Sequence, residues 1–170
     1  ADPIGELERL YVKFGADASD EDMDEARAET ARLQSGDPEV LELWKRFITV
    51  SMAEFDRVYR RMGVKFDVTL GESFYNDKLP ETVEASLRAG VACESDGAII
   101  VKFGAEDGKS LNDTVLVIRK NDGAFLYGTT DLATLRHRRD TWSPDRIIYV
   151  TDKRQQLHFR QVFRAWERQE

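Results

Sequence analysis

The feature that most constrains the fold is the stretch of residues 125–161, in which two apolar runs each lead into a helical pattern. The first run covers residues 125–127, and we expect the helix after it to start at or next to Asp131. The second run covers residues 146–150 and precedes another helix. Strands and helices that alternate with short connections are typical of a parallel α/β unit. We therefore predict a strand–helix–strand–helix unit, with ligands bound beyond the carboxyl ends of its strands.

Polar side chains lie at the carboxyl ends of both predicted strands: Tyr127, which ends the first, and Asp131 beyond it, and Gln155 and His158 beyond the second. Asp131 is either a helix-start residue only, stabilised by free N–H groups of the first turn, or an anionic anchor beside the Tyr127 hydroxyl. His158 is either a surface or capping residue or a ligand contact. No nucleophile–base pair, Walker A sequence or G-x-G-x-x-G motif is present. These residues predict a site that prefers a small polar cation, and they predict no reaction.

The chain is expected to be helical up to residue 63. Apolar spacing predicts a helix over residues 4–14, and an acidic, weakly apolar run predicts an exposed one over residues 20–34. A third helix is expected to start at Pro38, after Asp37, and to end at Gly63. Its apolar stripe is expected to be core. The stripe consists of Leu41, Trp44, Ile48, Met52, Phe55, Tyr59 and Met62.

Residues 64–124 are expected to form a small antiparallel β element inserted ahead of the α/β unit. Its loop at residues 69–76, which contains Glu72, either carries function or only connects its neighbours. The other predicted elements are a strand at 64–68, a helix from Leu79 to a stop at Gly90, and strands at 91–93, 98–103 and 114–118.

Composition narrows the class of protein. The 170 residues are 41% hydrophobic and 34% charged, without an apolar run that could span a membrane. A net charge of −7 argues against a general nucleic-acid-binding surface on this chain. The single cysteine, Cys93, fits a reducing cytoplasm and is expected to be a packed core thiol. One cysteine and two histidines are too few for a zinc cluster.

Three long strings carry a resemblance to a known family: LELWKRFITVSMAEFDRVYRRMGVKFDVTLGESFYNDKLP, DGAFLYGTTDLATLRHR and DRIIYVTDKRQQLHFRQVF. The chain resembles the arginyl-tRNA synthetases, which are class I aminoacyl-tRNA synthetases. The resemblance implies an α/β fold that forms part of a Rossmann-type parallel sheet. Residues 1–170 are then expected to be a partial catalytic domain in three parts. Residues 1–63 are its helical part, residues 64–124 its insertion with short strands and residues 125–170 its Rossmann half.

The resemblance also implies a function, which is the ATP-dependent charging of tRNA with arginine through an arginyl-adenylate. Within the family's LY-x-TTD, RQ-x-x-H-F and GES strings, the arginine-binding residues match Tyr127, Asp131, Gln155 and Glu72. His158 matches a position on the adenylate side, and no residue here matches a catalytic acid or base. The implied partners are L-arginine, ATP with Mg²⁺, and tRNA(Arg), for a monomeric parent protein without a tightly bound cofactor or a membrane contact.

Two motifs that are typical of the family are missing from this stretch. Neither a HIGH-type nor a KMSKS-type motif, which act on the ATP phosphates, occurs in it. We therefore expect a central piece of a catalytic domain that holds much of the arginine pocket and is inactive alone. The alternatives are a non-catalytic arginine-binding or regulatory module, and a purely structural α/β domain.

Overall fold

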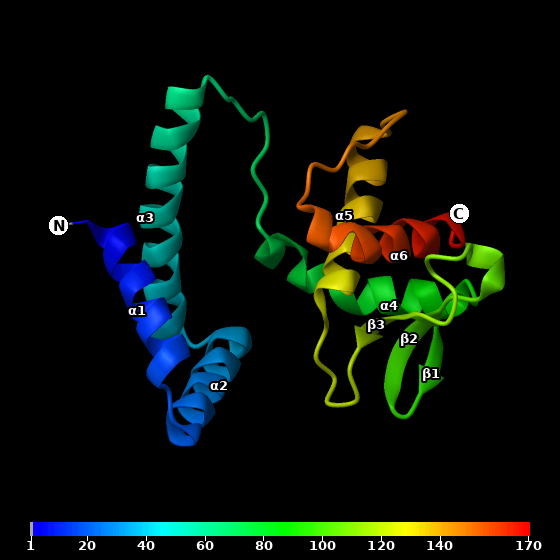
Figure 1. Ribbon diagram of the computed structural model, residues 1–170, viewed down its shortest axis with the longest axis horizontal. Coiled ribbons are helices and arrows are strands. Elements are labelled where there is room, and N and C mark those ends of the chain that lie inside the picture. Colours follow the sequence, from blue (N-terminus) through cyan, green and yellow to red (C-terminus); the bar gives the residue numbers. More distant parts are fainter. Residues whose placement is uncertain (1) are drawn as a thin grey trace. The chain divides into compact units, whose positions relative to one another are not determined.

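The computed structural model describes residues 2–170, which divide into two compact units at Val68 and Thr69 (Figure 1). The first unit contains three helices, α1 (Pro3–Asp17), α2 (Asp20–Ser35) and α3 (Pro38–Met62). Within that unit α1 and α2 both pack against α3. All three helices predicted from the sequence are therefore confirmed.

Local signals explain where these helices begin and end. Ser19 and Asp22 form a reciprocal capping box at the start of α2, with each side chain accepting a backbone N–H of the other. Asp37 caps α3 by accepting the N–H groups of Glu39 and Val40, at 3.0 and 3.2 Å. Gly63 ends α3 with a φ of 69°, a left-handed conformation that favours glycine.

The apolar stripe of α3 differs from the prediction, because no residue of this helix is buried. Ile48, Phe55 and Met62 are exposed, and the other members of the stripe are half-buried. Within the first unit α1 and α2 cover only part of the surface of α3, so the expected core is incomplete there.

The second unit combines a small sheet with helices. Strands β1 (Cys93–Ser95), β2 (Ala98–Lys102) and β3 (Val115–Arg119) pair antiparallel in that order, as predicted, with β1 two residues later than expected. Ile100 lies opposite Cys93 on one side and Val117 on the other. The remaining elements are η1 (Glu72–Lys78), α4 (Leu79–Arg88), η2 (Ala105–Asp107), α5 (Tyr127–Trp142), η3 (Lys153–Gln155) and α6 (Gln156–Glu167).

One hydrophobic core joins the sheet to the helices of the second unit, which gather beside it in Figure 1. Val101 of β2 and Ile118 of β3 are fully buried together with Val83 of α4, Leu132 of α5 and Val162 of α6. The residues expected as a separate insertion and those expected as the Rossmann half thus share one core.

The two predicted parallel strands are absent from the described residues. Residues 125–127 do not form a strand, because Phe125 makes one isolated antiparallel bridge to Arg119 and α5 already begins at Tyr127. Residues 146–150 have no ladder partner, and Ile148 and Val150 are 75% and 95% exposed. A strand is defined by its neighbour's hydrogen bonds, so an apolar run alone does not make one.

Two smaller predictions are also wrong. Residues 64–68 form no strand, and Cys93 is exposed at the start of β1 rather than packed in the core. Across residues 2–170, none of the helices combines the length and the apolar character that a bilayer span requires.

Candidate functional site

The start of α5 is fixed by strand β3. The hydroxyl of Thr129 donates a hydrogen bond to the carbonyl oxygen of Ile118. Gly128 lies so close to β3 that a Cβ atom on it would meet Cδ1 of Leu116 at 2.8 Å. The Thr129 side chain therefore ties the first turn of α5 to the sheet, and the helix has no side-chain cap.

Asp131 lies in the second turn of α5, because this helix begins four residues earlier than predicted. The free N–H groups of the first turn are therefore not its main partners. Its carboxylate oxygen Oδ2 lies 2.5 Å from Nε2 of His158 on α6. An ionised carboxylate only accepts hydrogen bonds, so Nε2 is the donor.

Tyr127 completes a group of three residues. Its ring lies edge-to-face on the His158 ring, with centroids 4.6 Å apart, and the other neighbour of His158 is Phe159 at 4.9 Å. The structure thus joins Tyr127, Asp131 and His158, which come from two helices and lie up to 31 residues apart in the sequence.

The other two predicted site residues are not joined to this group by a described contact. Glu72 is the exposed first residue of η1, which packs against α5. Gln155 is exposed and directly precedes α6, three residues before His158. Within residues 2–170 neither side chain hydrogen-bonds to Tyr127, Asp131 or His158.

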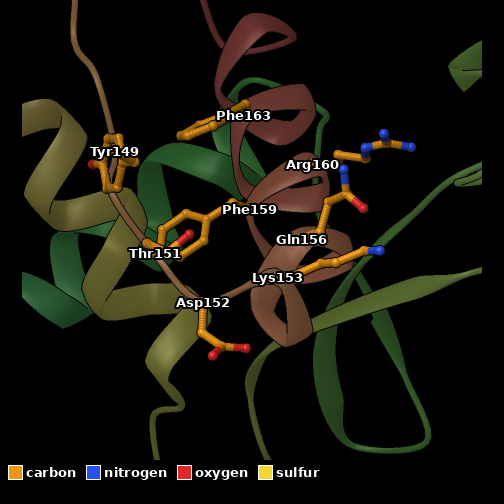
Figure 2. A pocket seen from close by; sticks show the side chains of 8 residues that line it. All are labelled: Tyr149, Thr151, Asp152, Lys153, Gln156, Phe159, Arg160 and Phe163. Carbon is orange, nitrogen blue, oxygen red and sulfur yellow. The ribbon is translucent and has the colours of Figure 1, made fainter.

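A hollow of about 370 Å³ opens on the neighbouring surface of α6 (Figure 2). In Figure 2 the side chains of Lys153, Gln156 and Arg160 extend to the same side of the helix start. None of the five predicted site residues lines this hollow. Its lining consists of Tyr149, Thr151, Asp152, Lys153, Gln156, Phe159, Arg160 and Phe163.

Helix α6 is held in place by a charged cluster that the sequence did not reveal. The side chain of Asp107, which is fully buried, accepts hydrogen bonds from Nε of Arg164 at 2.7 Å and from Arg168. It also accepts the N–H of Gly104 at 2.9 Å. Burial, the largest influence, raises the pKa of Asp107, but these hydrogen bonds together hold the pKa below its usual value. No periodic signal links residues nearly 60 positions apart.

Strand β3 supports α6 as well as α5. The side-chain amide of Gln161, which is buried, donates to the carbonyl oxygen of Val115 at 3.1 Å. Both helices that carry the candidate site are therefore tied to backbone carbonyls of one strand.

The chemistry available to the group of Tyr127, Asp131 and His158 is recognition of a cation. A carboxylate and a phenol hydroxyl both accept hydrogen bonds, and Asp131 supplies the negative charge. The described residues hold no group of three His, Cys, Asp or Glu side chains that could bind a metal ion. The arrangement fits a guanidinium or an ammonium group better than a resident metal.

Comparisons with known proteins show the family to which the chain belongs. Residues 1–169 match the family model for "tRNA synthetases class I (R), catalytic domain". Arginine–tRNA ligase of Fusobacterium nucleatum is 44% identical over 163 residues, which are 95% of this chain and 28% of that protein. Arginine–tRNA ligase of Rhodopirellula baltica is 48% identical over 151 residues, 89% of this chain and 22% of that protein. The chain thus spans less than a third of the length of these relatives.

A solved structure gives the same fold. The crystal structure of arginyl-tRNA synthetase from Plasmodium falciparum superposes with a TM-score of 0.75 at 24% identity. The match covers 93% of this chain and 29% of the other.

Proposed function

Because this chain belongs to the family of class I arginyl-tRNA synthetase catalytic domains, we propose that it is part of an arginine–tRNA ligase. Such an enzyme uses ATP to convert arginine to an arginyl-adenylate and transfers the arginine to tRNA. The similarity over most of this chain to proteins named arginine–tRNA ligase supports the proposal. L-arginine, ATP and tRNA(Arg) are the partners of the whole protein, which acts in the cytoplasm as a monomer.

The arginine side chain would be held chiefly by Asp131. The observation that carries this role is the position of its carboxylate, one helical turn from Tyr127 and fixed by a neighbouring helix. A guanidinium group presents a planar fork of N–H donors that suits carboxylate and hydroxyl acceptors. Their match to the family strings assigns Glu72 and Gln155 to the same pocket. Taken alone, the match of His158 to these strings would put it on the adenylate side.

No residue of this stretch would act as a general acid or base. Adenylate formation depends on holding the reactants in line and on stabilising phosphate charge. In the proposed enzyme these tasks belong to residues outside residues 1–170, and any Mg²⁺ would arrive with the ATP phosphates. This assignment rests on the absence of HIGH- and KMSKS-type motifs from this stretch.

We also propose that residues 146–150 become a strand of a parallel Rossmann sheet in the longer protein. Alternation of side chains supports this: Ile147 and Tyr149 pack on the core of the second unit, whereas Ile148 and Val150 are exposed. A neighbouring layer supplied by the rest of the protein would cover the exposed pair.

The test is an ATP–pyrophosphate exchange assay with the full-length protein and its Asp131→Asn variant. Loss of one partner from a desolvated charged pair costs about 3–5 kcal/mol, so the arginine KM is expected to rise by roughly 100-fold or more. The ATP KM should stay unchanged. Asp140→Asn, at an exposed acid of the same helix, is the matched control. An unchanged arginine KM and kcat in Asp131→Asn would refute the assignment.

A further inference from the structure

We propose that His158 is a positioning residue that fixes the carboxylate of Asp131 for arginine, and that it does not act on the adenylate. This inference rests on the proposed function, since it concerns how the same pocket selects its substrate. It assigns the selectivity for a guanidinium to a contact between two helices rather than to Asp131 alone.

The first line of evidence is the contact itself. Nε2 of His158 lies 2.5 Å from Oδ2 of Asp131, and the two side chains are only 14% and 25% exposed. A hydrogen bond to an ionised group that is shielded from water is among the stronger ones in proteins. It holds the carboxylate in one rotamer before any ligand arrives.

The second line of evidence is how the imidazole is held. Its ring packs edge-to-face on Tyr127 at 4.6 Å and on Phe159 at 4.9 Å. The contact with Tyr127 means that one ring touches both residues proposed to meet the guanidinium. A shift of His158 would therefore disturb the two together.

The third line of evidence is what the contact leaves free. Across residues 2–170, His158 makes the one side-chain hydrogen bond to Asp131, and it uses Oδ2. A carboxylate offers roughly four acceptor sites, so Oδ1 of Asp131 remains for a guanidinium N–H. Nε2 of His158 is already engaged by Asp131, so this nitrogen is not free to donate to a phosphate.

The experiment compares variants at position 158 in the full-length enzyme, again by ATP–pyrophosphate exchange. Glutamine can place an N–H near the position of Nε2, whereas asparagine is too short and phenylalanine keeps the ring without a donor. We expect His158→Phe and His158→Asn to raise the arginine KM about 10-fold, the effect of losing a hydrogen bond to a charged group. His158→Gln should stay within about threefold of the wild-type KM, and all three should keep the ATP KM.

Two controls separate a local effect from general damage. His137→Phe makes the same change at the other histidine of the chain, which lies near the C-terminal end of α5, and should leave the arginine KM unchanged. In an Asp131→Asn background, His158→Phe should add less than about twofold, because the carboxylate it positions is gone.

The outcomes are distinguishable. If Asp131→Asn raises the arginine KM but His158→Phe and His158→Asn do not, the inference is wrong and the proposed function stands. A rise in the ATP KM without a change for arginine would place His158 on the adenylate side and also overturn the inference. If Asp131→Asn has no effect, the proposed assignment of Asp131 to the arginine pocket fails, and the inference fails with it. If His158→Phe does not fold, comparing the arginine KM of His158→Gln with that of His158→Asn still tests the inference.

Discussion

The hydroxyl of Thr129 in the first turn of α5 donates a hydrogen bond to the main-chain carbonyl of Ile118 in β3, and both residues are fully buried. Together with the close approach of Gly128 to Leu116, this contact sets where the helix that carries Tyr127 and Asp131 meets the sheet. The carbonyl of Ile118 lies inside the core, so water is not available to replace the hydroxyl.

Replacing Thr129 by valine is expected to destabilise the catalytic domain by about 1–3 kcal/mol, because it leaves a buried carbonyl without a donor. Valine has nearly the same shape as threonine, so no cavity contributes. The change should appear as a lower urea midpoint of the full-length protein. Thr129→Ser keeps the hydroxyl and should lose less stability than Thr129→Val. Equal losses of stability in the two variants would show that the methyl group, not the hydrogen bond, matters.

Gly128→Ala should also be destabilising, although alanine favours helices. The new Cβ would meet Cδ1 of Leu116 at 2.8 Å, and crowding of a packed core costs about 1–3 kcal/mol. At Gly15 in α1, by contrast, an added Cβ would meet no atom within 4 Å. Gly15→Ala should therefore be neutral or stabilising by up to about 1 kcal/mol.

A double variant makes the comparison sharper. Leu116→Ala removes the crowding atom, so Gly128→Ala should cost less in that background than in the wild type. Thermal unfolding of the four proteins measures the difference. If the cost is the same in both backgrounds, the contact with Leu116 does not determine it.

Asp107 predicts a pH dependence of stability. Its folded pKa is depressed, so the stabilisation it provides is present above its unfolded pKa of about 3.9 and is lost as pH falls through the folded pKa. Asp107→Asn should lower the urea midpoint at pH 7, and the gap to wild type should narrow below about pH 4. A gap that stays constant from pH 7 to pH 3 would contradict the assignment.

Val150→Lys tests the proposed parallel sheet. Val150 is 95% exposed in this stretch alone, where a lysine would be harmless. If residues 146–150 form a covered strand in the longer protein, the substitution buries a charge and should cost on the order of 3 kcal/mol or more. An unchanged thermal midpoint of the full-length protein would argue that this segment stays at a surface.

Helix ends were predictable because their signals are local. Asp37 with Pro38 starts α3, and Gly63 and Gly90 follow the helices that they were expected to stop. The antiparallel strands β2 and β3 were predictable for a similar reason, since β-branched runs separated by turn residues pair with their neighbours in sequence.

The start of α5 could not be predicted, because Phe125, Leu126 and Tyr127 favour strands by composition, while their hydrogen bonds go elsewhere. Tertiary contacts outweigh propensity at this point, and the link from Thr129 to Ile118 is one of them.

The candidate site was predictable only in part. Residue types and strand-end positions indicated Tyr127, Asp131 and His158, but not that His158 would meet Asp131 across 27 residues of sequence. The cluster around Asp107 had no signal in the sequence, because an ion pair between η2 and α6, far apart along the chain, follows no period.

The two contacts of strand β3 with the helices determine where this domain can accept an inserted residue. Strand β3 holds α5 through the carbonyl of Ile118 and α6 through the carbonyl of Val115, three residues apart, or about 10 Å along a strand. Strand β3 therefore sets the spacing between α5 and α6. One residue added to the loop before β3 leaves that spacing intact, whereas one added between Val115 and Ile118 would lengthen it by about 3.3 Å. That is more than the distance between His158 and Asp131, so the pair would separate.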